Sequence, residues 1–303
     1  MSATVRTAGP AVTAVREVLA ASRPFSWVNT AYPFAAGWLL ATDGQVDVRL
    51  VVGTLFFLVP YNLLMYGIND VFDYASDLAN PRKGGIEGGL VDPSRARAAH
   101  RRILVACAVT TLPFTVWLLA LGSPLAGLVL LVVLFDVVAY SAPRLRFKER
   151  PVLDSLSSSI HFVGPLLYAL VLAGSDLGAR TTWPVLLAFL LWGMASHAFG
   201  AVQDVKADRA GGIGSVATVL GARPTVLAAT GAYVVAAAVL LALPWPGVLA
   251  ALLPLPYALS TWRFRGVTDE DCERANAGWR TFLWLNLVTG FLVTMLLIAV
   301  ALT

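Results

Sequence analysis

Long uninterrupted apolar runs constrain this chain more than any other feature of its sequence. Residues 102–121, 124–141 and 282–302 approach or reach the roughly 20 residues that an α-helix needs to cross the hydrocarbon core of a bilayer. Only 13% of the 303 residues are charged, about half the share that is usual in a soluble domain. Such runs leave no room for the alternating pattern of a membrane barrel, so the sequence predicts an all-α, polytopic membrane protein.

Nine membrane-spanning helices are predicted, and with their loops they form one transmembrane domain over residues 23–303. The predicted spans are residues 25–42, 48–68, 102–121, 124–141, 152–173, 182–203, 224–243, 246–262 and 279–302. Residues 1–22 lack the apolar core of a signal peptide. They are expected to form a frayed cytoplasmic tail or a short interfacial helix with Val12, Val15 and Leu19 on one side.

Lysine and arginine are distributed unevenly between the two sides of the predicted bundle. The N-terminal tail and the loops after spans two, four, six and eight hold 20 of the 22 basic residues, and the opposite side has only Arg49 and Arg180. The positive-inside rule therefore predicts a multi-pass protein of the cell membrane with a cytoplasmic N-terminus and a C-terminus outside. The net charge of +4 reflects this topology and does not indicate nucleic-acid binding.

Acidic residues gather where spans two and six leave the membrane on the cytoplasmic side. Asp70, Asp73 and Asp77 are spaced by three and four, so a helix that continues through them would place the three carboxylates on one face. Asn69 lies four residues before Asp73 and joins that face. Three like charges at this spacing repel one another, and a bound cation would explain the arrangement.

The end of span six repeats this pattern 134 residues further along the chain, at Asp204 and Asp208. Either cluster alone is also typical of a solvated helix end. Two matched clusters on one side of the membrane favour a site for Mg²⁺, which binds few carboxylates together with waters and phosphate oxygens. The predicted metal ligands are Asn69, Asp70, Asp73, Asp77, Asp204 and Asp208.

Basic residues adjoin both acidic clusters on the same side of the membrane. They are Arg82, Lys83, Arg144, Arg146, Lys148 and Arg150. Mg²⁺ combined with lysine and arginine side chains is suited to binding and ionising a diphosphate. We therefore expect a diphosphate site at the cytoplasmic edge of the bundle, the alternative being that these residues only set the topology.

The motifs resemble those of the UbiA-type intramembrane prenyltransferase superfamily. The first family motif, N-D-x-x-D-x-x-x-D, is matched by Asn69, Asp70, Asp73 and Asp77. The second, D-x-x-x-D, is matched by Asp204 and Asp208, which are followed by Arg209 and the glycine-rich residues 211–214. Residues 140–148, Tyr-Ser-Ala-Pro-Arg-Leu-Arg-Phe-Lys, resemble the family's connection after span four. Motif order and spacing agree over nearly the whole chain.

Two further segments resemble one branch of this superfamily, the lycopene elongases that act on carotenoids. Residues 80–89 replace the Arg-Pro-x-x-x-Gly segment that many members carry after the first motif, and residues 196–204 precede the second motif. The departure at residues 80–89 counts against aromatic acceptors such as hydroxybenzoate without excluding them.

The resemblance implies a helical bundle around a cavity that opens to lipid, with the active site on the cytoplasmic side. Two Mg²⁺ ions held by the aspartate motifs would bind a prenyl diphosphate, and Asp70, Asp73, Asp204 and Asp208 would be catalytic. The expected reaction is transfer of a five-carbon dimethylallyl group to lycopene in C50 carotenoid biosynthesis, with other carotenoid enzymes as candidate partners. The alternative acceptors are a quinone precursor, another aromatic compound or an alcohol.

Polar residues inside the predicted spans run inward in columns from the acidic clusters. Asn62 precedes Asn69 by seven residues and His197 precedes Asp204 by seven, so each pair shares a helix face. Charged and strongly polar groups are costly in a bilayer and usually face a cavity or a partner. The further residues of this kind are Asp136, Tyr140, Asp154 and His161.

These polar columns have either a functional or a structural role. Asp136 or Asp154 would take a proton from a carbocation, the alternative being a carboxyl that is only paired or protonated. Tyr61 and Tyr66 would stabilise a cation through their π faces, or would simply pack. The predicted substrate contacts are Asn62, Tyr66, Asn69, Arg82, Lys83, Arg144, Arg146, Lys148, His161 and His197. The histidines would otherwise make interhelical hydrogen bonds.

Two competing functions use similar residues. Membrane CDP-alcohol phosphotransferases also bind Mg²⁺ through paired aspartate motifs, but their Asp-Gly-x-x-Ala-Arg signature precedes neither cluster. An ion-coupled transporter would place ionisable residues near the membrane midplane, at broken helices. The aspartates of this chain lie at one membrane face, which favours the prenyltransferase.

Overall fold

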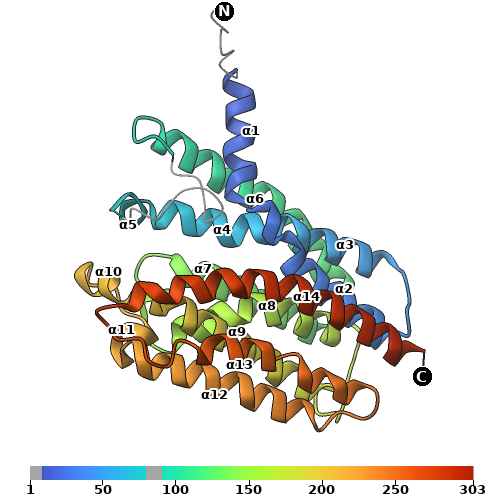
Figure 1. Ribbon diagram of the computed structural model, residues 1–303. Helices are drawn as coiled ribbons and strands as arrows, with labels where there is room; N and C mark the ends of the chain where they lie inside the picture. The colour runs from blue at the N-terminus through green and yellow to red at the C-terminus, as the bar shows by residue number, and fades with distance from the viewer. Residues whose placement is uncertain (1–8, 80–90, 303) are drawn as a thin grey trace, which may run out of the picture.

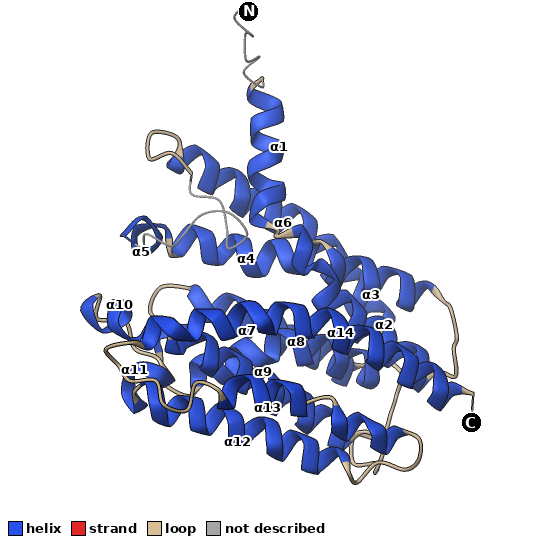
Figure 2. Cartoon of the chain, in the orientation of Figure 1, coloured by secondary structure: helices blue, strands red, loops and turns tan. Residues whose placement is uncertain are grey.

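Every regular element in the described part of the chain, residues 9–79 and 91–302 of this computed structural model, is a helix (Figures 1 and 2). The longer helices are α1 (Pro10–Ala21), α2 (Trp27–Ala41), α3 (Val48–Leu58), α4 (Pro60–Phe72), α6 (Ala96–Leu121), α7 (Pro124–Ser141), α8 (Leu153–Leu172), α9 (Trp183–Val202), α12 (Ala222–Leu240), α13 (Leu255–Trp262) and α14 (Asn276–Ala301). The shorter ones are α5 (Tyr74–Ala79), α10 (Val205–Ala210) and α11 (Val216–Leu220), with the 3-10 helices η1 (Pro24–Ser26), η3 (Phe147–Glu149), η4 (Gly247–Leu252) and η5 (Cys272–Ala275).

Within residues 9–79 and 91–302, seven apolar helical segments are long enough to cross a membrane. They are Val48–Phe72, Ala96–Leu121, Pro124–Ser141, Leu153–Leu172, Trp183–Val202, Ala222–Leu240 and Cys272–Ala301. The two remaining predicted spans coincide with shorter helices, namely α2, which has 15 residues, and the apolar segment Gly247–Trp262. For the part of the chain that the structure describes, the predicted all-helical class is confirmed, and seven of the nine predicted spans have membrane length.

Local sequence signals explain where several of these helices begin. The Asp47 side chain accepts hydrogen bonds from the backbone N–H groups of Arg49 and Leu50 at the start of α3. Ser123 accepts one from Ala126 at the start of α7, where proline occupies the first helical position. Both are N-caps that satisfy backbone donors which no helical carbonyl can reach.

The second membrane segment is interrupted twice. Pro60 lacks an amide hydrogen, and α3 ends just before it at Leu58. The chain turns helical again as α4 and breaks once more at Asp73, so the continuous helix that we expected through Asp77 is wrong. The break coincides with ion pairs that join the Asp73 carboxylate to Arg146 and Lys148, on a different part of the chain.

Helix α8 lies at the centre of the bundle and packs against α2, α7 and α9. Helix α9 packs in turn against α12, and α12 against α13, whereas α4 packs against α6 and α7. Helix α14, red in Figure 1, contacts α13, α9 and α2 and so completes a ring of helices. Helix α1 projects from this ring and packs against α4 and α6.

Two aromatic cores hold the bundle together. One contains Phe34, Phe57 and Tyr61 and joins α2, α3, α4, α7 and α8. The other contains Tyr233 and Tyr257 and joins α9, α12, α13 and α14. These five side chains are at most 2% exposed, and their packing holds the surrounding helices in place.

Candidate active site

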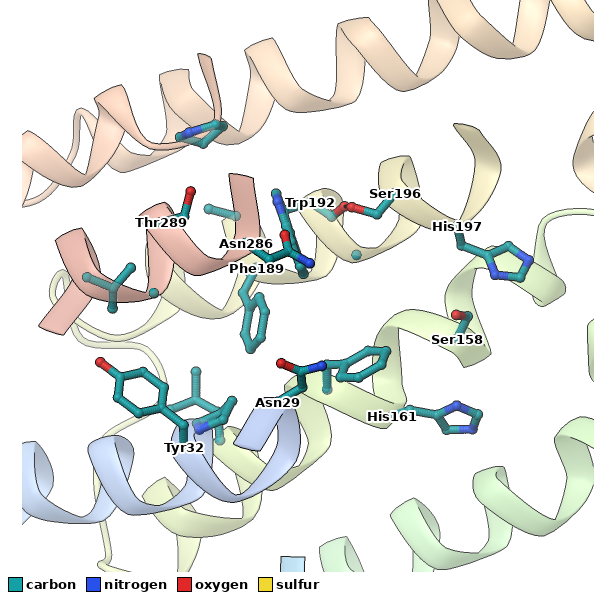
Figure 3. Close-up of a pocket in the computed structure, with 18 of the residues that line it drawn as sticks. Asn29, Tyr32, Ser158, His161, Phe189, Trp192, Ser196, His197, Asn286 and Thr289 are labelled. Carbon is teal, nitrogen blue, oxygen red and sulfur yellow. Dashed lines mark hydrogen bonds between the residues drawn. The ribbon is translucent and has the colours of Figure 1, made fainter. Parts of the chain in front are cut away.

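A cavity of about 1940 Å³ lies inside the ring of helices. Its lining residues follow α9 from Thr182, just before the helix, to Ala201 near its end. A helix rises 1.5 Å per residue, so the cavity is about 30 Å long, which matches the hydrocarbon core of a bilayer. Side chains from α2, α8, α9 and α14 face one another across it (Figure 3).

Both acidic motifs reach the same end of this cavity. Asn69 and Asp73, from α4 and its C-cap, line it together with Asp204 and Asp208, from the junction of α9 with α10. The two sets are more than 130 positions apart in the sequence and come together only because α4 and α9 point their ends to one side. The side chain of Asp77 lies outside the described residues.

Cationic side chains pair with two aspartates of the first motif. Asp73 is 4% exposed and forms ion pairs with Lys148 and, at 3.5 Å, with Arg146. Asp70 does not line the cavity and instead pairs with Arg23 at 2.9 Å. The same guanidinium lies 4.4 Å from the ring centroid of Tyr66, so it covers one face of that ring.

Arg146 and Lys148 lie on the loop between α7 and α8, which has an unusual backbone conformation. Arg144, Arg146 and Val152 all have positive φ, a conformation that costs non-glycine residues roughly 1 kcal/mol or more each. Arg146 also pairs with Glu149, and this hydrogen bond lowers the pKa of the Glu149 carboxyl below its ordinary value of 4.5. Strained backbone persists only where the surrounding structure holds it in place, and it is often found at functional sites.

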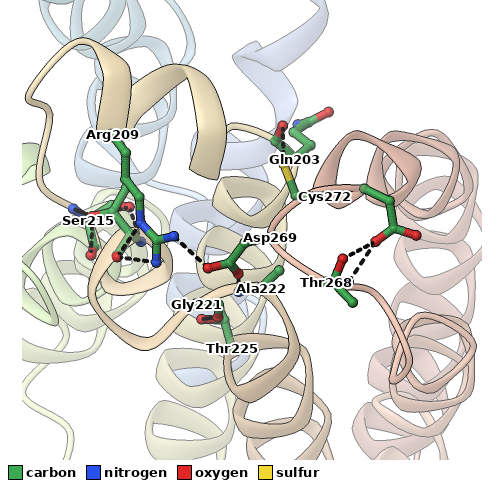
Figure 4. Close-up of polar contacts among 11 residues, drawn as sticks. Gln203, Arg209, Ser215, Gly221, Ala222, Thr225, Thr268, Asp269 and Cys272 are labelled. Atoms are coloured by element: carbon green, nitrogen blue, oxygen red, sulfur yellow. Dashed lines mark hydrogen bonds and ion pairs between the residues drawn. The ribbon is translucent and has the colours of Figure 1, made fainter.

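The helix that carries the second motif is anchored by Arg209, the residue after Asp208 (Figure 4). Its guanidinium donates to the carbonyl of Thr218 and pairs with Asp269 at 2.5 Å. Asp269 also accepts a 2.6 Å hydrogen bond from the backbone N–H of Ala222, at the start of α12. That N–H and then Arg209 lower the pKa of the Asp269 carboxyl below its ordinary value of 3.8.

Close contacts at Gln203 and at Gly214 hold the segments on either side of the second motif. Gln203 accepts a 2.6 Å hydrogen bond from Asn276, and its backbone carbonyl lies 3.7 Å from the Cys272 sulfur, so the start of α14 is bound to the end of α9. Gly214 approaches the loop after α7 so closely that an added Cβ would lie 2.6 Å from the carbonyl oxygen of Glu149. Only glycine permits this approach, which joins the connections beside the two motifs.

Two histidine–aspartate pairs lie deeper along the cavity. His161 Nε2 is 3.6 Å from Asp136 Oδ2, and His197 Nε2 is 3.7 Å from Asp154 Oδ2. Both imidazoles line the cavity, as Figure 3 shows, whereas neither aspartate does. The Tyr140 ring lies against both histidines, with centroid distances of 4.9 Å to His161 and 6.5 Å to His197.

Several predicted site residues lie elsewhere. Asn62 is fully buried away from the cavity, and its amide nitrogen donates to Thr30 and to the Phe57 and Leu58 carbonyls, so its column position serves packing rather than substrate contact. Tyr61 is also fully buried outside the cavity wall. Arg144 does not line the cavity either. Arg82, Lys83 and the segment 80–89 lie outside the described residues.

The sequence did not single out the polar residues in the middle of the cavity. They are Asn29, Tyr32, Asn286, Thr289 and Thr294. Tyr257 donates to the side-chain oxygens of Asn286 and Thr289, and Tyr32 and Thr294 share a 2.8 Å hydrogen bond that joins α2 to α14. In both α2 and α14, an asparagine inside an otherwise apolar span could have indicated a residue that faces a cavity.

The oxygen ligands at the end of the cavity where the two aspartate motifs meet, called the motif end below, fit Mg²⁺ that is bound together with a diphosphate. Among the described residues, no three histidine, cysteine, aspartate or glutamate side chains form a group that could hold a metal ion. Mg²⁺ does not require such a cage, since it commonly binds one or two carboxylates and completes its shell with water and substrate phosphate oxygens. Asp73 on one side and Asp204 with Asp208 on the other supply carboxylates to that end of the cavity.

The sequence of this chain is similar to those of several known proteins. The model of a family described as the UbiA prenyltransferase family matches residues 30–287. A C50 β-cyclic carotenoid biosynthesis protein of Dietzia sp. is 55% identical over 91% of this chain, and the chain spans 63% of the length of that relative. A lycopene elongase/hydratase of Corynebacterium glutamicum is 47% identical over 94% of this chain and 98% of its own length.

Solved structures share the fold. The structure of a UbiA homologue from Archaeoglobus fulgidus bound to DMAPP and Mg²⁺ superposes with a TM-score of 0.67 at 18% identity, over 90% of this chain and 98% of that chain. The apo structure of a UbiA homologue from Aeropyrum pernix gives a TM-score of 0.66 at 20% identity, with the same coverage.

Proposed function

Because this chain belongs to the UbiA prenyltransferase family, we propose that it is a lycopene elongase of C50 carotenoid biosynthesis. It would transfer a five-carbon dimethylallyl group from dimethylallyl diphosphate to each end of lycopene. The observation that carries this proposal is the 47–55% identity to carotenoid proteins over more than nine-tenths of the chain.

The cavity supports a hydrocarbon acceptor. Its described lining residues include two basic side chains, Arg23 and Lys148, and both are paired with aspartates of the first motif. Both basic side chains therefore lie where a diphosphate would bind. The rest of the described cavity wall has no lysine or arginine that could bind an acceptor carboxylate. A linear apolar molecule instead gains from burial in a long chamber lined mainly by aliphatic and aromatic groups.

The motif end is where we place the donor. Asn69, Asp73, Asp204 and Asp208 would hold Mg²⁺, two ions in our proposal, and Mg²⁺ when bound neutralises the diphosphate and stabilises its departure. Lys148 would contribute a charge-assisted contact to a phosphate oxygen in exchange for its ion pair with Asp73.

Arg146, on the loop between α7 and α8, and Arg23, just before η1, would also bind phosphate oxygens in exchange for their ion pairs with Asp73 and Asp70. Since Arg23 covers one face of Tyr66, only the opposite face of that ring remains for a substrate cation.

The reaction requires little covalent help from the protein. The C–O bond of the donor breaks and its electron pair leaves with the diphosphate, and the terminal double bond of the acceptor then attacks the allylic cation. A new C–C bond forms and leaves a tertiary carbocation on the acceptor. Loss of a proton or addition of water resolves that cation, and the chamber keeps other nucleophiles away.

We also propose an orientation in the membrane. The motif end faces the cytoplasm because 20 of the 22 basic residues belong to that side of the predicted topology. Helix α1 would lie at the same interface, where its exposed Val12, Val15 and Leu19 contact lipid and Glu17 stays paired with Arg95 and Arg102. The cavity would open to lipid at the sparse contact between α2 and α14.

Expression in a lycopene-producing host tests the acceptor. We expect carotenoids that are heavier than lycopene by one and two five-carbon units, because the chain has two ends to extend. If lycopene stays unaltered while a quinone precursor, another aromatic compound or an alcohol is prenylated, the acceptor proposal is wrong and only family membership remains.

A further inference from the structure

Asp136 of α7 and His161 of α8 form a buried pair that donor binding does not use. Asp136 is 6% exposed and His161 is 4% exposed, yet the imidazole lines the cavity. Nε2 is turned toward Asp136 Oδ2 at 3.6 Å, and neither of these two buried atoms has a hydrogen-bond partner among the described residues. Polar groups this deeply buried are normally paired, so the pair calls for a functional explanation.

A hydrogen bond from His161 to the Asp136 carboxyl would set which imidazole nitrogen is basic. The other oxygen of Asp136 already accepts a 2.8 Å hydrogen bond from Ser157, which holds the carboxyl in place. A small closure of the 3.6 Å gap would let Nε2–H donate to Oδ2, and such contacts often tighten when substrate binds. Nδ1 then carries the lone pair, as in other aspartate–histidine pairs in which the carboxyl sets the tautomer.

The pair lies at the depth where the reacting carbons would be. On α7, Ser141 donates a 2.8 Å hydrogen bond to Asn69 of the first motif, and Asp136 lies five residues before Ser141. Five residues of helix correspond to about 7.5 Å, so Asp136 is one to two turns deeper than the motif. A five-carbon group anchored by its diphosphate at the motif end would extend inward from there, toward Asp136.

The second pair is built differently. Asp154 Oδ2, the oxygen nearest His197, already accepts a 2.8 Å hydrogen bond from the backbone N–H of Val216 at the start of α11. Asp154 is fully buried and thereby ties α8 to the connection that follows the second motif. This oxygen of Asp154 already anchors α11, whereas the corresponding oxygen of Asp136 has no hydrogen-bond partner among the described residues.

We propose that His161 is the catalytic base that resolves the carbocation and that Asp136 positions it; this rests on the proposed function. In the first outcome, a proton on the carbon next to the cation moves to His161 Nδ1 and the C–H electron pair becomes the new double bond. In the second, water adds to the cation and Nδ1 takes a proton from that water, which leaves a tertiary alcohol. Either way, the proton leaves the imidazolium for solvent after the product has formed.

Purified protein in lipid vesicles, supplied with dimethylallyl diphosphate, Mg²⁺ and lycopene, tests this role. A positioned base contributes about 10²–10⁴-fold, so His161→Gln should slow formation of elongated carotenoid by at least about 100-fold. Affinity for a non-hydrolysable dimethylallyl diphosphate analogue should stay within about twofold, because the residue does not touch the diphosphate. Asp136→Asn should lower the rate in the same direction and shift the ratio of alkene to alcohol product.

Rescue separates a base from a structural residue. Imidazole added to His161→Ala should restore elongation, since the cavity has room for it. His100→Gln is the matched control and should keep the wild-type rate, because His100 packs edge-to-face on Tyr74, with ring centroids 4.7 Å apart, outside the cavity.

Three results would overturn the inference: wild-type rates and product ratios in His161→Gln, loss of donor affinity in His161→Gln, or imidazole rescue of His197→Ala alone. A wild-type protein that elongates no lycopene would instead contradict the proposed function.

Discussion

Replacing Asp269 with alanine should destabilise the protein by about 1–3 kcal/mol and loosen the helix that carries Asp208. The side chain has two roles that the structure separates. It caps α12 through the 2.6 Å hydrogen bond from Ala222, and loss of such a cap costs about 0.5–2 kcal/mol. It also pairs with Arg209, and an ion pair this exposed contributes about 0.2–1 kcal/mol.

Thermal unfolding of the purified protein in one detergent measures the effect. A loss of 1 kcal/mol lowers Tm by about 2–4 °C in a chain of 150–250 residues, so Asp269→Ala should fall by several degrees. Asp269→Asn keeps an oxygen that can accept from Ala222 and loses only the charge, so it should fall by less. Equal losses in the two variants, or no loss in either, would refute the separation into cap and ion pair.

The same residue predicts a pH dependence. Its pKa in the folded protein lies below the ordinary value of 3.8, so its contribution is complete above that value and disappears as the pH falls through the folded-state pKa. The Tm difference between wild type and Asp269→Ala should therefore be constant from neutral pH down to about 4 and shrink below it. A difference that shrinks between pH 7 and 5 would contradict the assignment.

The remaining predictions concern the motif end of the cavity. Asp73→Asn and Asp208→Asn should each lower Mg²⁺-dependent prenyl transfer by more than about 100-fold, since a hard oxygen ligand is lost, and near-normal turnover in both would contradict the metal site. Lys148→Ala should weaken donor binding by about 10- to 100-fold, the value of one charge-assisted hydrogen bond, measured as KM for dimethylallyl diphosphate; an unchanged KM would restrict Lys148 to setting topology. Gly214→Ala should lower both Tm and donor affinity, because its Cβ would lie 2.6 Å from the Glu149 carbonyl oxygen, and wild-type values would show that the two connections can separate freely.

Those features of the fold that depend on short segments were predictable from the sequence. Apolar runs of membrane length specify helices because no other backbone satisfies its hydrogen bonds in lipid. The spacing of Asp204 and Asp208 placed them on one turn, and they do lie at one end of the cavity with Asn69 and Asp73.

Features that depend on contacts between distant segments were not predictable. The break at Asp73 coincides with ion pairs to residues more than 70 positions later, and nothing local to 69–77 signals it. Arg23 is one of the 20 basic residues whose distribution predicts the topology, yet it also pairs with Asp70, 47 residues later. Asn62 has the spacing predicted for a functional column, but its amide makes hydrogen bonds inside the bundle. Helix periodicity predicts which face a residue lies on, but not what that face contacts.

Product analysis with purified components tests the central claim most directly. Wild-type protein in lipid vesicles is given dimethylallyl diphosphate, Mg²⁺ and lycopene, and carotenoid masses and released diphosphate are measured in the same sample. We predict that one diphosphate is released for each five-carbon unit gained by lycopene, and that chelating Mg²⁺ stops both. Diphosphate release without any heavier carotenoid, or transfer that persists without a divalent cation, would contradict the account.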